Sequence, residues 1–383
     1  MKTNSKARLI IASSENCADL YWATKFYVPD PIVFIEHRGR KILVASDLEV
    51  SRARKEADVD QVLSSTHYEN QLKKSGRQRK RGDVLDAILK ERKIRTLEVP
   101  SDFPIREAEN LRQFGYRLEI ASDPYYPARA IKTQEEKKSI TQALRMTEAG
   151  IQAAIDVLRN SKIQKPKKKN GNLPLFWNGS PLTSEILRSV IERTMMEKGA
   201  LGQHTIVACG SQAADPHCRG TGALYANQTI VMDVFPKSMK TGYYGDITRT
   251  VVKGRASDDL KRMYAAVKKS QENGIRAIHA GVDAAKVHAK VSQTLVDAGF
   301  ETGIVNGKPQ GFIHSTGHGL GLEIHEAPRV SRISETLKAG HVVTVEPGLY
   351  YEDKGGIRIE DVVFVTRTGC EVLTRLPKVF EIA

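Results

Sequence analysis

The chain has 383 residues, of which 40% are apolar and 27% charged. These values are typical of a globular protein and exclude a disordered or collagen-like chain. At roughly 150 residues per domain, the length predicts one large or two ordinary domains. No apolar run approaches the ~18 residues that span a bilayer, and the short run at residues 9–12 cannot form a signal peptide. We therefore expect a cytoplasmic protein without a membrane segment.

The cysteines and the excess charge are both informative through their positions. Four scattered cysteines form no CxxC pair, so we expect reduced thiols and neither a disulfide framework nor a zinc ribbon. The net charge of +14 comes mostly from two basic loops without anions, the first at residues 73–81 and the second at residues 162–169. Short charge clusters of this kind are usually solvated, which disfavours a nucleic-acid partner.

The first part of the chain alternates between strand and helix patterns. Apolar runs at 31–37 and 41–45 flank Arg38-Gly39-Arg40 and predict a hairpin, which a helix at 47–57 follows. The pattern then predicts helices at 83–93 and 105–114 around a strand at 96–99. We expect a small α/β domain over residues 1–128.

The second part, residues 129–383, follows a proline-rich stretch and opens with a long amphipathic helix after Thr133. Long strands are then interleaved with pairs of helices, which favours an α+β domain with an antiparallel sheet over a doubly wound one. No phosphate-binding glycine motif occurs. The expected strands are 205–208, 229–235, 242–252, 342–350 and 356–366, and the expected helices are 184–198, 257–279 and 284–298.

Four acidic residues interrupt apolar strands in this second part, namely Asp233, Asp246, Glu346 and Glu360. A buried carboxylate without a partner costs several kcal/mol, so each acid needs a cation beside it. Arginines close in sequence, Arg249 and Arg358, are one possible source of that charge. A metal centre is the other.

A histidine cluster favours the metal centre. His314, His318 and His325 lie among glycines within twelve positions, and His217 is a possible fourth member. Carboxylates with one or two imidazoles suit Mn²⁺, Co²⁺ or Fe²⁺ at least as well as Zn²⁺, and disfavour copper. Four acids balance two divalent ions, and two ions about 4 Å apart support metal-assisted hydrolysis.

Four strings resemble the signatures of the M24 pita-bread metallopeptidases, which include Xaa-Pro dipeptidase (prolidase), aminopeptidase P and methionine aminopeptidase. The resemblance covers residues 132–370, and the first 125 residues resemble a creatinase-type N-terminal domain. It implies a pita-bread catalytic domain, and the extra domain disfavours a methionine aminopeptidase. The strings are Asp246-Ile-Thr-Arg-Thr, Gly317-His-Gly-Leu-Gly-Leu-Glu-Ile-His-Glu, Val345-Glu-Pro-Gly and Arg358-Ile-Glu-Asp.

The resemblance also implies a ligand set for two divalent ions, with manganese favoured. Asp246 and Glu360 would bridge the ions, Asp233 would bind one, and His318 with Glu346 would complete the other. Glu346 would in addition carry the proton from the attacking water to the leaving nitrogen.

Further residues are implied for the substrate. His217 and His325 would bind it and stabilise the tetrahedral intermediate, and His314 would line the pocket. Arg358, two residues before a bridging ligand, would orient Glu360, and Arg329 would clamp a substrate carboxylate.

The resulting prediction is a dinuclear peptidase that hydrolyses Xaa-Pro bonds, above all in dipeptides, through a metal-bridging hydroxide, with a peptide substrate and a homodimeric assembly. The first alternative is an Xaa-Pro aminopeptidase acting on longer peptides. The alternative from another class is a non-catalytic scaffold that binds protein or nucleic acid through the basic loops. Asp233-Val-Phe-Pro is bulkier than in many relatives, and its spacing to Asp246 is two residues longer. Dipeptide specificity therefore rests on analogy.

Overall fold

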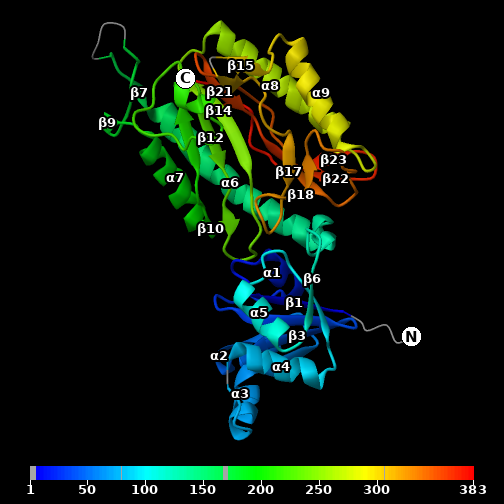
Figure 1. Cartoon of the computed structure of the whole chain (residues 1–383). Coiled ribbons are helices and arrows are strands. Elements are labelled where there is room, and N and C mark those ends of the chain that lie inside the picture. The colour runs from blue at the N-terminus through cyan, green and yellow to red at the C-terminus, as the bar shows by residue number, and fades with distance from the viewer. Residues whose placement is uncertain (1–5, 79, 167–170, 306) are drawn as a thin grey trace. The chain divides into compact units, whose positions relative to one another are not determined.

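The computed structural model describes residues 6–78, 80–166, 171–305 and 307–383 (Figure 1). The chain divides into two compact units, Met1–Arg129 and Ala130–Ala383. Among the described residues, every helix is too short or too polar to cross a membrane. All four cysteines are described, and each is a free thiol.

The first unit is built on a mixed six-stranded sheet in the order β4-β3-β2-β1-β5-β6. β1, β2 and β3 pair antiparallel, whereas β4, β5 and β6 join the sheet as parallel strands. The elements are β1 (Ala7–Ala12), α1 (Ala18–Thr24), β2 (Ile32–His37), β3 (Arg40–Ala45), α2 (Asp47–Glu56), β4 (Gln61–Ser64), α3 (Ser65–Lys74), α4 (Arg81–Glu91), β5 (Thr96–Val99), α5 (Ile105–Gln113) and β6 (Arg117–Ile120).

Alternation along β1 gives this sheet a core on each face. Leu9 and Ile11 belong to one apolar cluster with residues of α3, α4 and α5, whereas Ile10 belongs to a second cluster with residues of α1 and α2. Side chains of successive strand residues point to opposite faces, so a single strand can supply both cores. The hairpin and α2 were predicted, but α1 and α3 were not.

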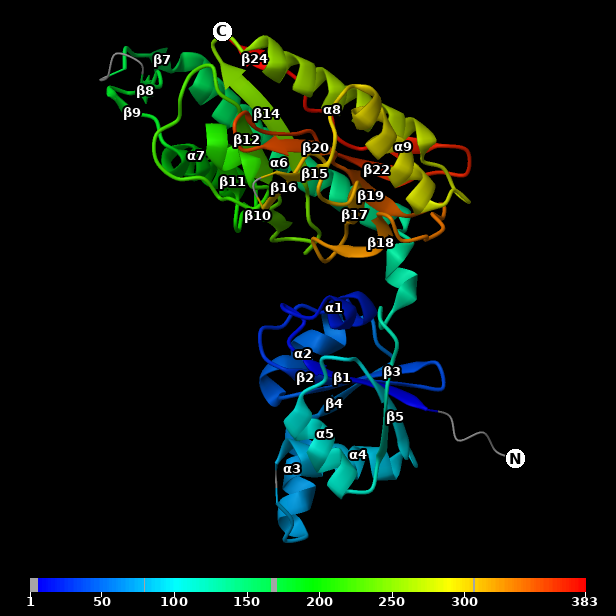
Figure 2. The ribbon, with the colours of Figure 1, turned by 45° about the horizontal axis from the view of Figure 1, so that its top comes forward.

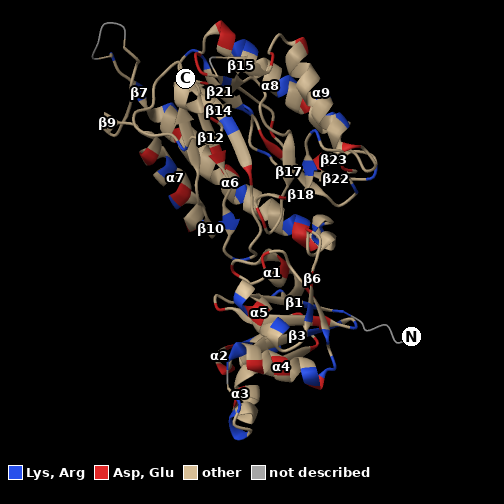
Figure 3. Cartoon of the chain, viewed as in Figure 1, with Lys and Arg blue, Asp and Glu red and all other residues tan. Residues whose placement is uncertain are grey.

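The first basic loop is shorter than predicted. Lys73 and Lys74 end α3 and Arg81 begins α4, so the region is helical at both ends and basic at the tip of α3 (Figure 3). Arg77 is not simply solvated, because its Nη2 donates to Oδ2 of the buried Asp86 over 2.8 Å. A buried carboxylate needs such a cation. Residue 79 lies outside the described residues.

The second basic loop is described only in part. Lys162 begins the short strand β7, and both Lys162 and Lys165 are exposed, in agreement with a solvated segment. Residues 167–169 lie outside the described residues.

The second unit confirms the predicted α+β class. Antiparallel β11, β12 and β14 form one sheet with β24, and β18-β17-β19-β22-β23 form an antiparallel second sheet. The elements are α6 (Gln134–Asn160), β7 (Lys162–Ile163), β8 (Leu175–Trp177), β9 (Ser180–Pro181), α7 (Ser184–Glu197), β10 (Ala200–Leu201), β11 (Ile206–Cys209), β12 (Ile230–Val234), β13 (Lys237–Ser238), β14 (Ile247–Lys253), α8 (Asp258–Ala277), α9 (Ala284–Asp297), β15 (Gly303–Val305), β16 (Lys308–Gln310), β17 (Gly317–Gly319), β18 (Glu326–Val330), β19 (Val342–Val345), β20 (Gly348–Tyr351), β21 (Gly355–Arg358), β22 (Asp361–Val365), β23 (Cys370–Val372) and β24 (Glu381–Ile382).

Two helix pairs cover these sheets, and they lie beside different strands (Figure 2). Apolar residues of α8 and α9 pack against β19, β20, β21 and β22. α6 and α7 pack against β14 and β11, and α6 begins with a capping box between Thr133 and Glu136. Gly150 of α6 lets α7 approach, because a Cβ there would lie 2.8 Å from Cγ of Met195.

Two of the expected strands are interrupted at the predicted glutamate ligands, Glu346 and Glu360. The expected strand 342–350 divides into β19 and β20 at Glu346-Pro347, and the expected strand 356–366 divides into β21 and β22 at Ile359-Glu360. The backbone N–H of Glu346 donates to the Thr316 carbonyl, and that of Glu360 donates to the Thr248 carbonyl. The chain thus leaves regular pairing at both acids.

Candidate metal centre

One cavity of about 600 Å³ in the second unit is lined by all of the predicted metal ligands and substrate-binding residues. The ligand candidates and the substrate-side candidates come from six separate segments. Those lining the cavity are His217, Asp233, Asp246, His314, His318, His325, Arg329, Glu346, Arg358 and Glu360.

The tightest group in this cavity is Asp246, His318 and Glu360. One possible ligand atom from each lies within 4.8 Å of the others, an arrangement that can hold a metal ion. Nε2 of His318 lies 3.6 Å from Oδ2 of Asp246 and 3.3 Å from Oε1 of Glu346. Asp233 lines the same cavity but lies outside this group of three.

His318 is oriented by its backbone surroundings. Its Nδ1 lies 3.1 Å from the Gly319 carbonyl, which can only accept, so Nδ1 carries the proton and the lone pair of Nε2 faces the carboxylates. Both neighbouring glycines are needed for close strand contact. A Cβ on Gly317 would lie 2.0 Å from the Thr344 carbonyl oxygen, and one on Gly319 would lie 2.3 Å from that of Ala327.

Two threonines that the sequence reasoning missed hold the glutamates. Thr248 Oγ1 donates to Glu360 Oε2 over 2.8 Å, and Thr344 Oγ1 donates to Glu346 Oε1 over 3.2 Å. Thr344 also accepts from the backbone N–H of His318. A signal was present, because each threonine lies two residues from a predicted ligand, the spacing that shares a strand face.

Arg358 contacts Asp233 directly and is linked to the predicted partner, Glu360, through a threonine. Its Nη2 donates to Asp233 Oδ2 over 2.7 Å, whereas Glu360 is held by Thr248. Arg358 reaches Glu360 through this threonine, because its Nε donates to Thr248 Oγ1 over 3.2 Å. Oδ1 of Asp233 is buried without a hydrogen-bond partner.

Arg358 also begins a hydrogen-bonded chain through a tyrosine that was not predicted. Arg358 Nη1 donates to the Tyr350 hydroxyl over 2.7 Å, and that hydroxyl lies 2.9 Å from Nε2 of His314. Nδ1 of His314 lies 2.7 Å from the Ser315 carbonyl, so Tyr350 donates to Nε2. Burial, followed by Arg358, lowers the pKa of His314 to about 3.

The acids of the cavity are crowded into a buried space. Burial raises the pKa of Asp246 well above its usual range, and the nearby carboxylates of Glu360 and Asp233 raise it further. The pKa of Glu360 is raised in the same way, by burial and then by Glu346. Burial raises the pKa of Glu346 to about 8 although Arg358 opposes the shift. Such a cluster favours an added positive charge.

These residues fit divalent metal ions. Among the described residues, arginine or lysine pairs with Asp233 but not with Asp246, Glu346 or Glu360, so arginine pairing does not explain the four acids. An unsatisfied carboxylate oxygen on Asp233 and a neutral imidazole on His318, whose pKa burial lowers to about 3, add two free donor atoms. An oxygen-rich set with one imidazole suits Mn²⁺, Fe²⁺, Co²⁺ or Zn²⁺.

Three of the substrate-side candidates, His217, His325 and Arg329, are exposed. His325 stands beside the cluster with its ring centroid 4.3 Å from that of His318. His217 and Arg329 are exposed, and within the described chain no carboxylate or carbonyl engages the Arg329 guanidinium. Isoleucine and phenylalanine side chains complete the wall, at Ile206, Phe235, Ile313 and Ile324.

Known proteins share both the sequence pattern and the fold. The model of metallopeptidase family M24 matches residues 138–367. The Xaa-Pro dipeptidase of Pyrococcus furiosus is 30% identical over 272 residues, which cover 70% of this chain and 69% of that protein. The crystal structure of an X-Pro aminopeptidase from Thermotoga maritima has a TM-score of 0.81 at 25% identity, covering 99% of this chain and 98% of that one. An Xaa-Pro dipeptidase structure from Bacillus anthracis has a TM-score of 0.80 at 25% identity, covering 98% and 95%. This chain, with its cluster of carboxylates around His318, therefore belongs to metallopeptidase family M24 and has the pita-bread fold.

Proposed function

We propose that the protein is a dinuclear metal-dependent peptidase that hydrolyses Xaa-Pro bonds, above all in dipeptides. One observation supports this most directly. A buried carboxylate cluster and an exposed, unengaged arginine, Arg329, line the same cavity. Such a cavity can activate water at one end and bind a carboxylate at the other.

Five residues would hold two divalent ions. Asp246 and Glu360, the most deeply buried acids of the cavity, would bridge them. Asp233 would bind one ion through the oxygen that Arg358 leaves free, and His318 with Glu346 would bind the other. Thr248 and Thr344 would keep the two glutamate carboxylates from rotating.

Bound ions of this kind lower the pKa of water and polarise the scissile carbonyl. Glu346 would accept the proton of the attacking water and deliver it to the leaving nitrogen. Its position suits this task, because Thr344 fixes Oε1 and the carboxyl group lies at the cavity wall. His217 and His325 would donate hydrogen bonds to the oxygen on which negative charge develops.

The substrate would lie between the ligand cluster and the exposed rim. Ile206, Phe235 and Ile324 offer apolar surface for the proline ring. Arg329 would pair with the free carboxylate that follows proline in a dipeptide. His314 would contribute shape rather than a hydrogen bond, because both of its ring nitrogens already have partners.

An Xaa-Pro aminopeptidase acting on longer peptides is the second candidate. The fold resembles an X-Pro aminopeptidase as closely as it resembles an Xaa-Pro dipeptidase, with 25% identity in both cases. The exposure of Arg329 at the rim is compatible with a longer chain passing beside it. The two activities therefore differ in whether substrate binding at Arg329 requires a free carboxylate directly after proline.

Turnover of Ala-Pro and Ala-Pro-Ala would test the proposal. Chelator-stripped protein would be resupplied with Mn²⁺, Co²⁺ or Zn²⁺, and bound metal would be counted in parallel. Cleavage of the dipeptide alone is the expected result. Preference for the tripeptide would make the enzyme an aminopeptidase, and two bound ions with neither peptide cleaved would move the specificity away from proline. If the protein binds no metal, the result would favour the alternative that it is a non-catalytic scaffold.

Three finer points stay predictions. They are the preference for manganese, the homodimer and the cytoplasmic location. Metal-dependent turnover, sedimentation and fractionation of the producing cells would test them in turn.

A further inference from the structure

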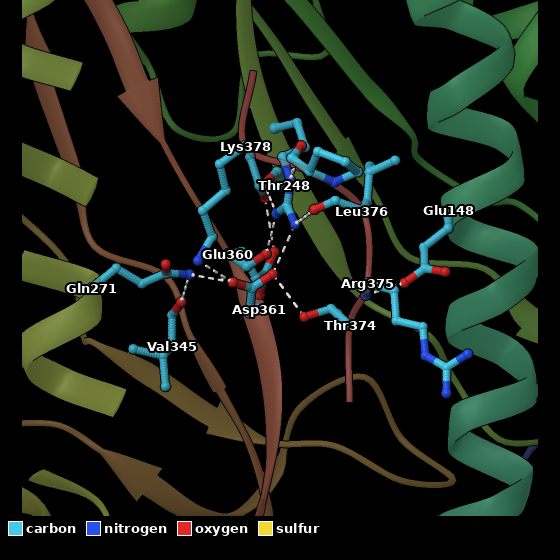
Figure 4. Close-up of polar contacts among 12 residues, drawn as sticks. Glu148, Thr248, Gln271, Val345, Glu360, Asp361, Thr374, Arg375, Leu376 and Lys378 are labelled. Carbon is cyan, nitrogen blue, oxygen red and sulfur yellow. Dashed lines mark hydrogen bonds and ion pairs between the residues drawn. The ribbon is translucent and has the colours of Figure 1, made fainter. Parts of the chain in front are cut away.

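A buried polar cluster lies directly behind the predicted metal ligands, on the far side of the strands that carry them. Its centre is Asp361, the residue after the ligand Glu360, with a side chain only 3% exposed (Figure 4). Its carboxylate accepts from four groups. These are Arg249 Nη2 at 2.8 Å, Thr374 Oγ1 at 2.7 Å, Lys378 Nζ at 2.7 Å and Gln271 Nε2 at 3.1 Å.

Arg249 connects this cluster to both predicted bridging ligands. It lies on β14, three residues after Asp246, and its side chain is 2% exposed. Its Nη1 donates to the backbone carbonyl of Glu360 over 2.6 Å and to that of Thr248 over 3.0 Å. The same guanidinium therefore holds β14 and the main chain of Glu360 at a fixed separation.

Gln271 extends the cluster to a third ligand. Its Nε2 donates to Asp361 and also to the carbonyl of Val345, the residue before Glu346. Val345 and Asp361 are register partners in β19 and β22. Asp361 is thus linked to the main chain beside Asp246, Glu346 and Glu360, although it lines no part of the cavity.

The segment 373–378 packs against the buried polar cluster and supplies several of its hydrogen bonds. The Leu373 N–H donates to the Val362 carbonyl, and the carbonyl of Leu376 accepts from Arg249 Nη2 over 2.6 Å. The Arg375 N–H donates to Glu148 of α6, which fixes the segment to a helix as well (Figure 4). Lys378 supplies a second cation to Asp361, and its side chain is 22% exposed.

We propose that Asp361 is a positioning residue for the metal centre, and that Lys378 and Thr374 of segment 373–378 hold it in place. The inference rests on the proposed dinuclear site. Asp361 has no access to a metal ion or a peptide, so it can act only by fixing the separation of the strands that end in the ligands. Loss of a donor from segment 373–378 should therefore loosen the ligand set without removing any ligand.

Lys378 offers the cleanest test, because its removal leaves Arg249 to balance Asp361. The variants are Lys378→Met, Lys378→Arg and the near-isosteric Thr374→Val. Lys269→Met removes an exposed lysine of α8, the helix that carries Gln271, and serves as the control. The readouts are the Co²⁺ dissociation constants of the chelator-stripped full-length chain, the visible absorption spectrum of the Co²⁺-loaded protein, and the melting temperature of the metal-free protein.

We expect Lys378→Met to weaken Co²⁺ binding about tenfold or more, the size usual for a group that orients a ligand, and to change the Co²⁺ spectrum. Lys378→Arg should restore both, and Lys269→Met should change neither. If Lys378→Met does not fold, Thr374→Val carries the same expectation. A lower melting temperature with unchanged Co²⁺ affinity and spectrum would show a merely structural role and overturn the inference.

The failure of this inference differs from the failure of the proposed function. Wild-type protein that binds two Co²⁺ ions but cleaves no Xaa-Pro peptide refutes the proposed specificity, while the variants still decide the role of Asp361. Wild-type protein that binds no Co²⁺ refutes both.

Discussion

The guanidinium of Arg358 holds one oxygen of Asp233 at 2.7 Å and leaves the other oxygen buried without a partner. A half-satisfied buried carboxylate is costly, because burial removes the water that would otherwise solvate the free oxygen. Arg358 cannot rotate away, since Thr248 and Tyr350 hold the same guanidinium. Asp233, which lines the cavity, therefore keeps one carboxylate oxygen available for an ion.

Replacing this arginine should weaken one of the two metal positions. In Arg358→Met, Asp233 loses the one arginine or lysine that pairs with it among the described residues. We expect the metal content after dialysis to fall from two ions towards one, with affinity at the second position reduced about 10- to 100-fold. Elemental analysis and titration with Mn²⁺ measure this. Arg367→Met, at an exposed arginine, is the matched control. Unchanged stoichiometry and affinity would mean that Asp233 needs no orientation.

Replacing Glu346 should separate catalysis from folding. Glu346→Gln keeps the volume and the contact with Thr344 but cannot accept a proton, so we expect kcat to fall about 10²- to 10⁴-fold. Turnover at saturating metal and peptide, together with a circular dichroism spectrum, tests this. Glu352→Gln, at an exposed glutamate, should leave turnover unchanged. Substantial activity in Glu346→Gln would remove this residue from proton transfer.

The metal-free protein should lose stability as pH rises. Burial raises the pKa of Glu346 to about 8, and the pKa values of Asp246 and Glu360 are raised as well. Each group therefore binds a proton in the folded chain that it releases on unfolding, so its stabilising contribution is present at low pH and lost as pH rises towards 8. The lowered pKa of His318 affects the pH dependence of stability only below pH 6.5, the ordinary pKa of a histidine.

Between pH 6.5 and pH 8 the acids therefore set the slope, at about 1.4 kcal/mol per pH unit for each proton. We expect the melting temperature in chelator to fall over this range and to fall less in Glu346→Gln. Excess Mn²⁺ should reverse the trend, because metal binding requires the deprotonated carboxylates. Scanning calorimetry with and without metal measures both slopes, and a metal-free melting temperature that rises over this range would contradict the assignment.

Replacing Arg329 should discriminate between peptide lengths. If its guanidinium pairs with the carboxylate after proline, Arg329→Leu should raise KM for Ala-Pro about tenfold or more while changing KM for Ala-Pro-Ala little. Arg332→Leu, at an exposed arginine three positions further on, is the control. Equal effects on both peptides would assign Arg329 to a role that does not depend on the peptide terminus.

The ligand candidates were predictable from the sequence because an acidic residue within an apolar strand pattern is unusual. Asp233 interrupts the otherwise apolar strand β12, and His318 lies between glycines, so both stand out without a structure. Pro347 and Gly348 after Glu346 are residues that commonly end a strand, whereas the interruption at Glu360 was not predictable because apolar residues lie on both sides of Glu360-Asp361. Strand periodicity therefore indicated Glu360 for Arg358 but gave no sign of its direct hydrogen bond to Asp233.

The surroundings of the ligands were harder to read for a different reason. Thr248 and Thr344 are common strand residues, and the only sign in the sequence is their spacing of two residues from a predicted ligand. The partners of Asp361 could not be predicted either, because Gln271 and Lys378 are far away from it in the chain. Contacts between distant segments leave no local periodicity to detect.

Because Gly317 and Gly319 have no side chain, the neighbouring strands can approach them closely, and this limits which substitutions the protein tolerates there. The two neighbouring strands, β18 and β19, approach these positions so closely that a single methyl group would collide with a carbonyl oxygen. Saturation mutagenesis should therefore show that substitutions at these two glycines are tolerated as poorly as substitutions at His318. The expected defect is loss of metal-dependent activity, even though neither glycine offers a ligand atom.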